Sequence, residues 1–294
     1  MQTRWLQPIL RFSGREQRAQ SLPKPATLTD CANRSVTNIV PSTLIMAAHT
    51  FGDPGLLREL RTAMGAQDGD PTATRRPDDL AKVPLLASLY AETLRFGVQI
   101  HIPRDAPHHT VQVGNSILPK KSFIMMNTWL AHSDAEAWNT QDGRRPLDQF
   151  WPHRFLVYPD DPTSGPSSKP CAPTAQGLPN ESKKQAVFST DGLQGSWIPY
   201  GSESRAGEAE ANLHPMREGL TLSLGGHHAC PGRLLAKRMM LHTVALLVRC
   251  YDMEALPVNR LPAFASPRFG FGVKKLAQRT PFRIRQRRLG EGRS

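Results

Sequence analysis

The sequence predicts a mainly α-helical fold with small β-sheets, an α+β class. Apolar residues recur with helical spacing in three long runs, at residues 28–66, 83–97 and 231–252. Shorter stretches such as VQIHIP and HTVQVGNSILPKKSFIMMNTWLA alternate between apolar and polar residues and are bounded by turn residues, which is typical of strands. With 294 residues and 39% hydrophobic content, the chain is long enough for a sizeable core.

The N-terminal elements follow from local sequence signals. Residues 1–30 are polar, basic and interrupted by proline, so we expect this segment to be poorly ordered. The first helical run should kink at Pro41, and a second helix should start at Asp53-Pro54, with the aspartate as N-cap and the proline at the first helical position. Residues 67–80 predict a loop, and Gly97 can end the helix 83–97.

The remaining elements are an excursion, a helix and a strand-rich end. Residues 157–192 are rich in proline, serine and aspartate and predict a long surface excursion. The run 231–252 is strongly helical. The closing sequence RFGFGVKKLAQRTPFRIRQRR predicts two short strands and a basic tail.

Composition excludes some classes of protein. The balance of 37 basic and 25 acidic residues gives a net charge of +12, which suits a nucleic acid, an anionic membrane or an acidic protein as partner. The basic residues are scattered and no nucleic-acid-binding motif accompanies them, so we expect no nucleic acid partner. The four widely spaced cysteines argue against a disulfide-stapled secreted fold. No apolar run reaches about 18 residues, so no spanning helix is predicted.

The stretch GGHHACPGRLLAKR, residues 225–238, has two histidines and a cysteine within four positions, between glycines. A zinc site is not favoured, because it needs four nitrogen or sulfur ligands and no second pair follows at zinc-finger spacing. A buried free cysteine is the ordinary alternative. Cys230, however, lies at a helix start among glycines, where backbone amides stabilise a thiolate. This environment suits an axial ligand to haem iron.

Two further motifs place charges in apolar surroundings. Glu92-Thr-Leu-Arg95 puts an acid and a base on one helix face, either as a surface ion pair or, since this helix is otherwise apolar, as a buried one. In Pro152-His-Arg154-Phe155 a single arginine stands among aromatic residues and prolines, where it can also extend to solvent.

The three motifs in this order resemble the cytochrome P-450 superfamily of haem-thiolate monooxygenases. The resemblance covers the chain from about residue 31 to its end and includes AHSDAEAW and the closing RFGFGV. It implies the C-terminal part of that fold, with residues 31–294 as a truncated domain. It also implies haem b (heme b, iron protoporphyrin IX) bound through the Cys230 thiolate, and a buried triad of Glu92, Arg95 and Arg154.

The resemblance assigns further residues one by one. His228 and, less directly, Arg104 match positions that contact the haem propionates, and Gly226 and Gly232 belong to the ligand loop. The first helix is similar to the oxygen-side helix of a branch related to the bile-acid and prostacyclin enzymes. There Asn38 takes a catalytic position; its alternative role is to cap the kink at Pro41.

One segment departs from the family pattern. Joining Tyr200-Gly201 to Gly225-Gly226 gives WIPYGGGHHACPG, which matches the pattern, and residues 202–224 interrupt it. We interpret this segment as an anomalous insertion of splicing or gene-model origin; a tolerated surface loop is the alternative.

The function implied by the resemblance is oxidation of a lipophilic small molecule. The expected reaction is a hydroxylation with O₂ and electrons from an NADPH-dependent reductase, in secondary-metabolite or sterol-like metabolism. Full-length members of the family are expected at the endoplasmic reticulum membrane, although this chain shows no anchor. The alternative is a truncated, non-catalytic remnant of such an enzyme.

Overall fold

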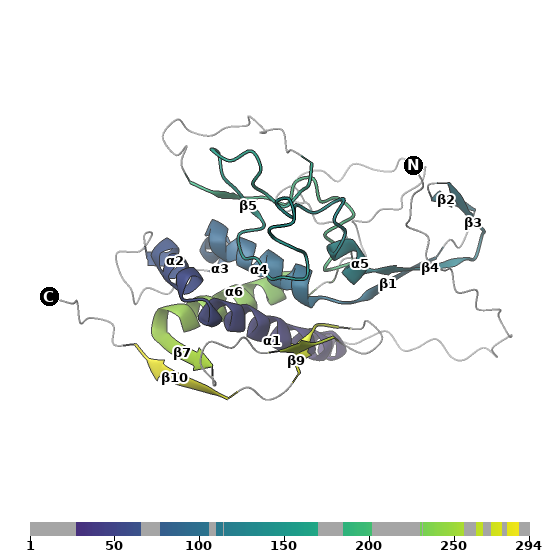
Figure 1. Ribbon diagram of the computed structural model, residues 1–294. Coiled ribbons are helices and arrows are strands. Elements are labelled where there is room, and N and C mark those ends of the chain that lie inside the picture. The colour runs from purple at the N-terminus through teal and green to yellow at the C-terminus, as the bar shows by residue number, and fades with distance from the viewer. Residues whose placement is uncertain are drawn as a thin grey trace.

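The computed structural model describes residues 28–65, 77–105, 110–113, 115–169, 185–201, 230, 232–255, 263–266, 272–277 and 281–287. Its long helices form the centre of the molecule (Figure 1). The helices of the described residues are α1 (Leu28–Gly52), α2 (Pro54–Gly65), α3 (Pro77–Leu80), α4 (Pro84–Gly97), α5 (Thr128–His132) and α6 (Arg233–Cys250).

The strands pair into small antiparallel two-stranded sheets at the periphery of the helices. Their pairs are β1 (His101–Asp105) with β4 (Phe123–Asn127), β2 (Val111–Val113) with β3 (Ser116–Leu118), β5 (Leu156–Val157) with β6 (Val187–Phe188), β7 (Tyr251–Ala255) with β10 (Phe282–Gln286), and β8 (Phe264–Ala265) with β9 (Lys275–Leu276). The predicted class, mainly α with small β-sheets, is confirmed.

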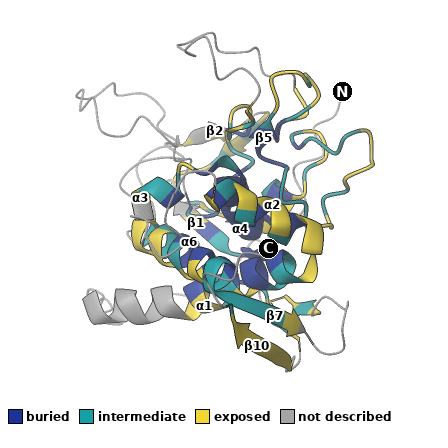
Figure 2. Ribbon diagram, turned by 90° about the vertical axis from the view of Figure 1, so that its left-hand side faces the viewer, coloured by how far each residue is buried: buried dark blue, intermediate teal, exposed yellow. Residues whose placement is uncertain are grey.

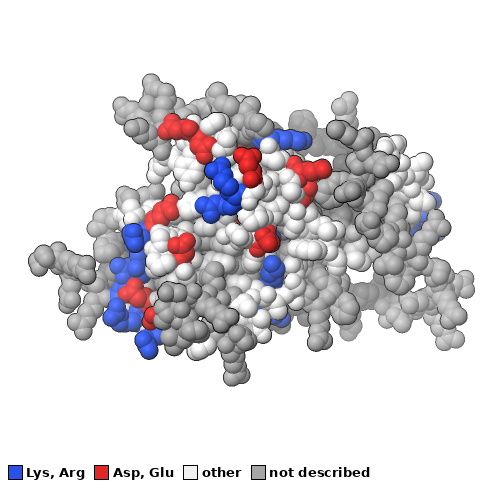
Figure 3. Space-filling view, in the orientation of Figure 1, with Lys and Arg blue, Asp and Glu red and all other residues white. Residues whose placement is uncertain are grey.

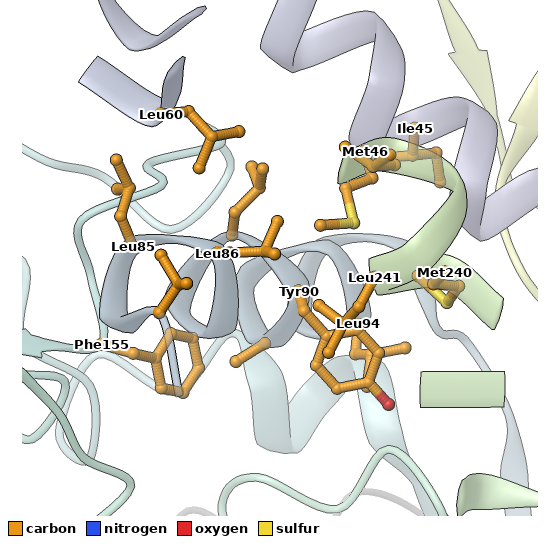
Figure 4. Packing of buried hydrophobic residues seen from close by; sticks show 14 of the residues in the cluster. Ile45, Met46, Leu60, Leu85, Leu86, Tyr90, Leu94, Phe155, Met240 and Leu241 are labelled. Carbon is orange, nitrogen blue, oxygen red and sulfur yellow. The ribbon is translucent and has the colours of Figure 1, made fainter. Parts of the chain in front are cut away.

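Helix α4 is the centre of the core. Nearly every one of its residues is buried, and it appears almost entirely dark blue in Figure 2. Figure 4 shows its leucines packed against side chains of the helices around it, among them Leu60 of α2, Met46 of α1 and Leu241 of α6. Each of these three side chains is fully buried, which contributes about 1.5–3 kcal/mol per residue. A helix buried all round can present functional side chains to several neighbours at once.

The start of α2 is as predicted. The Asp53 carboxylate accepts hydrogen bonds from the backbone N–H groups of Gly55 (2.8 Å) and Leu56 (3.1 Å), so it caps the helix. Helix α1 begins at Leu28, three residues before the predicted domain boundary, and continues through Pro41. Residues 1–27 lie outside the described residues.

Three predicted boundaries were wrong. The predicted loop 67–80 contains α3, which Pro77 at its start and Asp78 and Asp79 in its first turn stabilise. The strand-like pattern through 128–131 is helix α5, because the Asn127 side chain accepts the Trp129 N–H (2.8 Å) and caps a helix there.

The third wrong boundary is the end of the last helix. We predicted helix to residue 252, but α6 ends at Cys250, and Tyr251 and Asp252 pair with β10 as part of β7. A strand pairing between residues far apart in sequence decides this boundary, and helical periodicity carries no signal of it. In the excursion 157–192, the structure describes residues 157–169 and 185–192; β6 there pairs with β5.

The segment 272–274 brings the C-terminal part of the chain beside α1 and the end of α4. The Gln99 N–H donates to the Gly272 carbonyl and the Lys274 N–H to the Gly97 carbonyl, both at 2.8 Å. Gly272 has φ +115°, a conformation that other residues rarely adopt, and a Cβ there would lie 3.3 Å from Asn38 Oδ1. The glycine therefore allows this close approach to α1.

The described surface mixes charges of both signs. On the face in Figure 3, basic and acidic side chains are interspersed. The arginines of β10 lie near carboxylates of β7, with Arg283 3.8 Å from Glu254 and Arg285 3.6 Å from Asp252. None of the helices in the described part of the chain has the length and apolar character that crossing a bilayer requires.

Candidate functional site

Cys230 lies directly ahead of α6, whose N-cap is Gly232. Its backbone N–H donates to the Tyr200 carbonyl (3.2 Å), and its carbonyl accepts the Arg233 N–H (3.1 Å). The thiol-bearing residue is exposed. The backbone around Cys230 is thus held at both of its polar groups while the residue itself stays accessible.

The accessible side of Cys230 borders a cavity of about 290 Å³, which we call the Cys230 cavity. Helices α1, α4 and α6 form its walls, and the lining is mostly apolar. The lining residues are Asn38, Ile39, Ser42, Leu94, Val98, Ile100, Pro199, Tyr200, Cys230, Gly232, Ala236, Met240 and Val273. This volume is close to the lower end of the range of about 300–1,000 Å³ for ligand pockets.

Helix α1 contributes polar groups to the lining of the Cys230 cavity. Asn38 and Ser42 lie one helical turn apart and both line the Cys230 cavity. The Ser42 hydroxyl donates to the Asn38 carbonyl (2.9 Å), the next turn back. The Asn38 side chain is exposed and lies beside Gly272. The structure therefore places Asn38, predicted from the sequence, in the cavity with Cys230, and adds Ser42.

A pair of tyrosines lies beside Cys230. The hydroxyl groups of Tyr90, on α4, and Tyr200 are hydrogen-bonded to each other. Burial raises the pKa of Tyr200 to about 12, and burial and the Tyr200 phenol raise the pKa of Tyr90 well above its usual value. Both phenols are therefore protonated at neutral pH.

The residues around the cavity fit a haem group in their chemistry. A macrocycle with its own nitrogen donors needs one soft axial ligand and apolar walls, and Cys230 and the lining supply both. Gly232 and Ala236 are small and allow close approach on the α6 side. Within the described ranges no three His, Cys, Asp or Glu side chains gather in a way that could hold a bare metal ion.

The other face of α4 carries an ion cluster made of Glu92, Arg95 and Arg154. Arg95 makes two bonds to the Glu92 carboxylate, from Nε to Oε2 at 2.7 Å and from Nη2 to Oε1 at 2.8 Å. Arg154 Nε lies 3.3 Å from the same Oε2. All three side chains are 0–1% exposed. Of the alternatives that the sequence offered, the structure therefore has the buried ion pair and not the surface positions of Arg95 and Arg154.

Backbone carbonyls complete the ion cluster. Arg95 donates to the carbonyls of His132 (3.1 Å) and Leu147 (2.9 Å), and Arg154 to that of Asn139 (2.8 Å). Burial lowers the pKa of Arg154, against the opposing effect of Glu92. Two guanidinium groups face one carboxylate, so these carbonyls are needed to offset the desolvation of the second positive charge.

His132 connects the ion cluster to the segment that reaches Cys230. Its Nε2 accepts the Ile198 N–H (3.2 Å), so Nδ1 carries the proton and donates to the Arg95 carbonyl (3.1 Å). Burial lowers the pKa of His132 to about 3, with a further lowering by Arg95. The ring is therefore neutral at physiological pH and joins α4 to the segment just before Tyr200.

Several predicted residues lie outside what the structure describes. Gly226, His228 and the segment 202–224 are outside the described residues, so their predicted roles stay predictions. For Arg104 the structure describes only the backbone, which pairs with Ile124 in the β1–β4 sheet. The ends of the region that contains 202–224 nevertheless meet, because Tyr200 and Cys230 share a backbone hydrogen bond.

Sequence reasoning missed the contact residues of the site. His132 was within a segment noted for its resemblance, and Tyr200 within WIPYG, but neither received a role. Tyr90 and Ser42 had no signal beyond being polar residues on otherwise apolar helix faces. Their significance comes from neighbours more than 100 positions away, such as Tyr200 for Tyr90.

Comparison with known proteins gives one family. The family model described as cytochrome P-450 matches residues 55–165. A cytochrome P-450 monooxygenase, efuG, of Hormonema carpetanum is 33% identical over 86% of this chain and 41% of its own length. Another, fsoE, of Humicola fuscoatra is 32% identical over 86% of this chain and 40% of its own length. The chain therefore spans about two fifths of these relatives.

A solved structure shares the fold. A crystal structure of a cytochrome P-450 superposes with a TM-score of 0.53 at 16% sequence identity, covering 85% of this chain and 42% of that one. At this identity the match concerns the fold alone.

Proposed function

This chain belongs to the cytochrome P-450 superfamily, and from that premise we propose that it is a haem-thiolate monooxygenase in which Cys230 would hold the haem iron. The observation that carries the proposal is the position of Cys230. It is the one cysteine among the lining residues of the described cavity, and it lies directly before α6. When bound, haem b supplies the chemistry that activates O₂ for transfer of one oxygen atom to a substrate.

The protein's own residues have distinct roles in this proposal. Cys230 would hold the haem iron through its sulfur, and Gly232, which has no side chain, would permit a close approach beside it. Apolar side chains such as Leu94 and Met240 exclude water from the cavity. Their character favours a lipophilic small molecule as substrate, the class that the sequence predicts.

Asn38 and Ser42 are the polar side chains that α1 contributes to the Cys230 cavity. The Asn38 amide can both donate and accept hydrogen bonds, so it can orient a water molecule or a polar atom in the cavity. The Ser42 hydroxyl donates to the Asn38 carbonyl and, by rotating toward the cavity, can donate instead to a water molecule there while accepting a hydrogen bond from another. We propose that these two residues control proton delivery.

The electron donor in this proposal is an NADPH-dependent reductase. The two proteins would interact at the endoplasmic reticulum membrane, where full-length members of the family are expected. Helix α6, next to Cys230, carries Arg233, Lys237 and Arg238 near its start. Arg238 lies 3.1 Å from the exposed Asp78 carboxylate. Basic residues at this position suit a partner with an acidic docking surface.

A second candidate is a non-catalytic remnant of such an enzyme. The observation that favours it is the exposed apolar face of α1, where Val40 and Leu44, one turn apart, are 52% and 45% exposed. An exposed apolar face is a surface that a binding partner or ligand covers in a working protein, and in a remnant it would stay uncovered.

Spectroscopy of the full chain tests the proposal. The chain is expressed with a haem precursor, reduced under CO and compared with Cys230→Ser and the control Cys250→Ser. The proposal predicts stoichiometric haem and the red-shifted Soret band of thiolate-ligated iron in the wild type and in Cys250→Ser, and loss of that band in Cys230→Ser. A chain that folds but takes up no haem would support the remnant.

A further inference from the structure

Tyr90 faces away from the ion cluster although it is only two residues from Glu92. A separation of two residues turns a helix by about 200°, so the two side chains leave α4 on opposite sides. Tyr90 is 4% exposed, and Figure 4 shows its hydroxyl oxygen at the edge of the packed cluster. A buried phenol needs a hydrogen-bond partner, and Tyr200 provides it.

Tyr90 contacts the chain on both sides of Cys230. Before Cys230 in sequence, its hydroxyl bonds to that of Tyr200, whose carbonyl accepts the Cys230 N–H at 3.2 Å. After Cys230, the Lys237 ammonium on α6 lies 5.9 Å from the centre of the Tyr90 ring. One side chain of α4 thus links the two segments between which Cys230 is held.

We propose that Tyr90 is a positioning residue that acts through Tyr200 to hold Cys230 at the wall of the Cys230 cavity. This inference rests on the proposed function, since fixing the position of Cys230 has a functional role if its sulfur binds iron. The mechanism is a hydrogen-bonded chain from the Tyr90 hydroxyl to the Tyr200 hydroxyl, and from the Tyr200 carbonyl to the Cys230 amide. Because nearly every residue of α4 is buried, this helix is a rigid base for the hydrogen-bonded chain.

The first test uses the chain without haem. Selective ¹⁵N labelling of cysteine gives signals from only four residues, including Cys230 and Cys250. Hydrogen exchange at the Cys230 amide is compared between wild type, Tyr90→Phe, Tyr200→Phe and the double variant, with Tyr158→Phe as the control. Phenylalanine keeps each ring in place and removes only the hydroxyl.

The expected result is faster exchange at Cys230 by about 3- to 10-fold in both single variants, the factor for one lost hydrogen bond. The double variant should exchange no faster than either single one, because all three lack the same bond. Exchange at the Cys250 amide should be unchanged in every variant, and exchange at the Cys230 amide should be unchanged in Tyr158→Phe. Unchanged exchange at Cys230 in Tyr90→Phe, or single effects that multiply in the double variant, would overturn the proposal.

The second test uses the haem-loaded chain. Transfer of haem to excess apomyoglobin should be several-fold faster in Tyr90→Phe and Tyr200→Phe, and part of the thiolate-type Soret band under CO should be lost. A role in stability alone would lower the unfolding midpoint and leave the intensity of the thiolate-type band unchanged. If the wild type binds no haem, the proposed function fails, and the exchange experiment still decides whether Tyr90 positions Cys230.

Discussion

The two sides of α4 differ in how they hold a charged or reactive side chain. On one side Glu92, Arg95 and Arg154 are completely buried, and carboxylate or carbonyl oxygens accept from both guanidinium groups. On the other, Cys230 is exposed at a cavity and held only through its backbone. A structural charge must be satisfied by the protein, whereas a ligand atom must remain available. In our proposal, the difference distinguishes a cluster that stabilises the fold from a site that would bind the cofactor.

The largest expected effect is on the ion cluster. Glu92→Gln removes the charge that two buried guanidinium groups share, and breaking a buried ion pair in this way costs about 3–5 kcal/mol. Urea denaturation should show this loss in the free energy of unfolding. The matched control is Glu59→Gln, since Glu59 is half exposed and its pair with His153 (2.9 Å) should contribute less than about 1 kcal/mol. Equal losses in the two variants would contradict the comparison.

His132 should give a smaller loss with a pH signature. His132→Asn leaves the Ile198 N–H and the Arg95 carbonyl without their partner, at a cost of about 1–3 kcal/mol at neutral pH. In the wild type the pKa of His132 falls from 6.5 in the unfolded chain to about 3 in the folded one. The stabilisation from the neutral ring is therefore present above pH 6.5 and is lost as pH falls toward 3.

The measurement for His132 is the free energy of unfolding of both proteins across that pH range. The difference between wild type and His132→Asn should shrink as pH falls from 6.5 toward 3, because only the wild type takes up this proton on unfolding. His49, whose pKa burial lowers to about 4, is present in both proteins and cancels in the difference. A difference independent of pH would show that His132 is not held neutral.

On the cavity side, a backbone change tests how closely the C-terminal segment approaches α1. Gly272→Ala places a side chain at φ +115° and directs a Cβ toward Asn38, which should cost about 1–3 kcal/mol. Gly65→Ala is the control, because no atom lies within 4 Å of a Cβ there. Thermal unfolding should show a lower midpoint for Gly272→Ala only.

The smallest effect is expected at the surface. Arg283→Ala removes an ion pair with Glu254 that is long (3.8 Å) and exposed, so the free energy of unfolding should change by less than about 1 kcal/mol. Urea denaturation in low and high salt checks this value. A loss as large as that of Glu92→Gln would mean that the β7–β10 sheet carries stability that its exposure does not indicate.

The sequence was most informative where local chemistry decides the structure. The Asp53 cap, the helix ending at Gly97 and the charge pair within Glu92–Arg95 follow from residues a few positions apart. The meeting of Arg154 with Glu92 was predictable only through a family resemblance, because no periodicity joins residues 62 positions apart. The Tyr90–Tyr200 contact and strand β7 had no sequence signal, since tertiary packing alone creates them.

X-ray absorption at the iron edge of the haem-loaded chain would identify the protein ligand of the iron, because it reports the atoms bound to iron. We expect one sulfur scatterer in the wild type and in Cys250→Ser, and its replacement by a nitrogen or oxygen scatterer in Cys230→Ser. A sulfur signal that survives in Cys230→Ser, or iron without sulfur in the wild type, would contradict the assignment of Cys230 as the axial ligand.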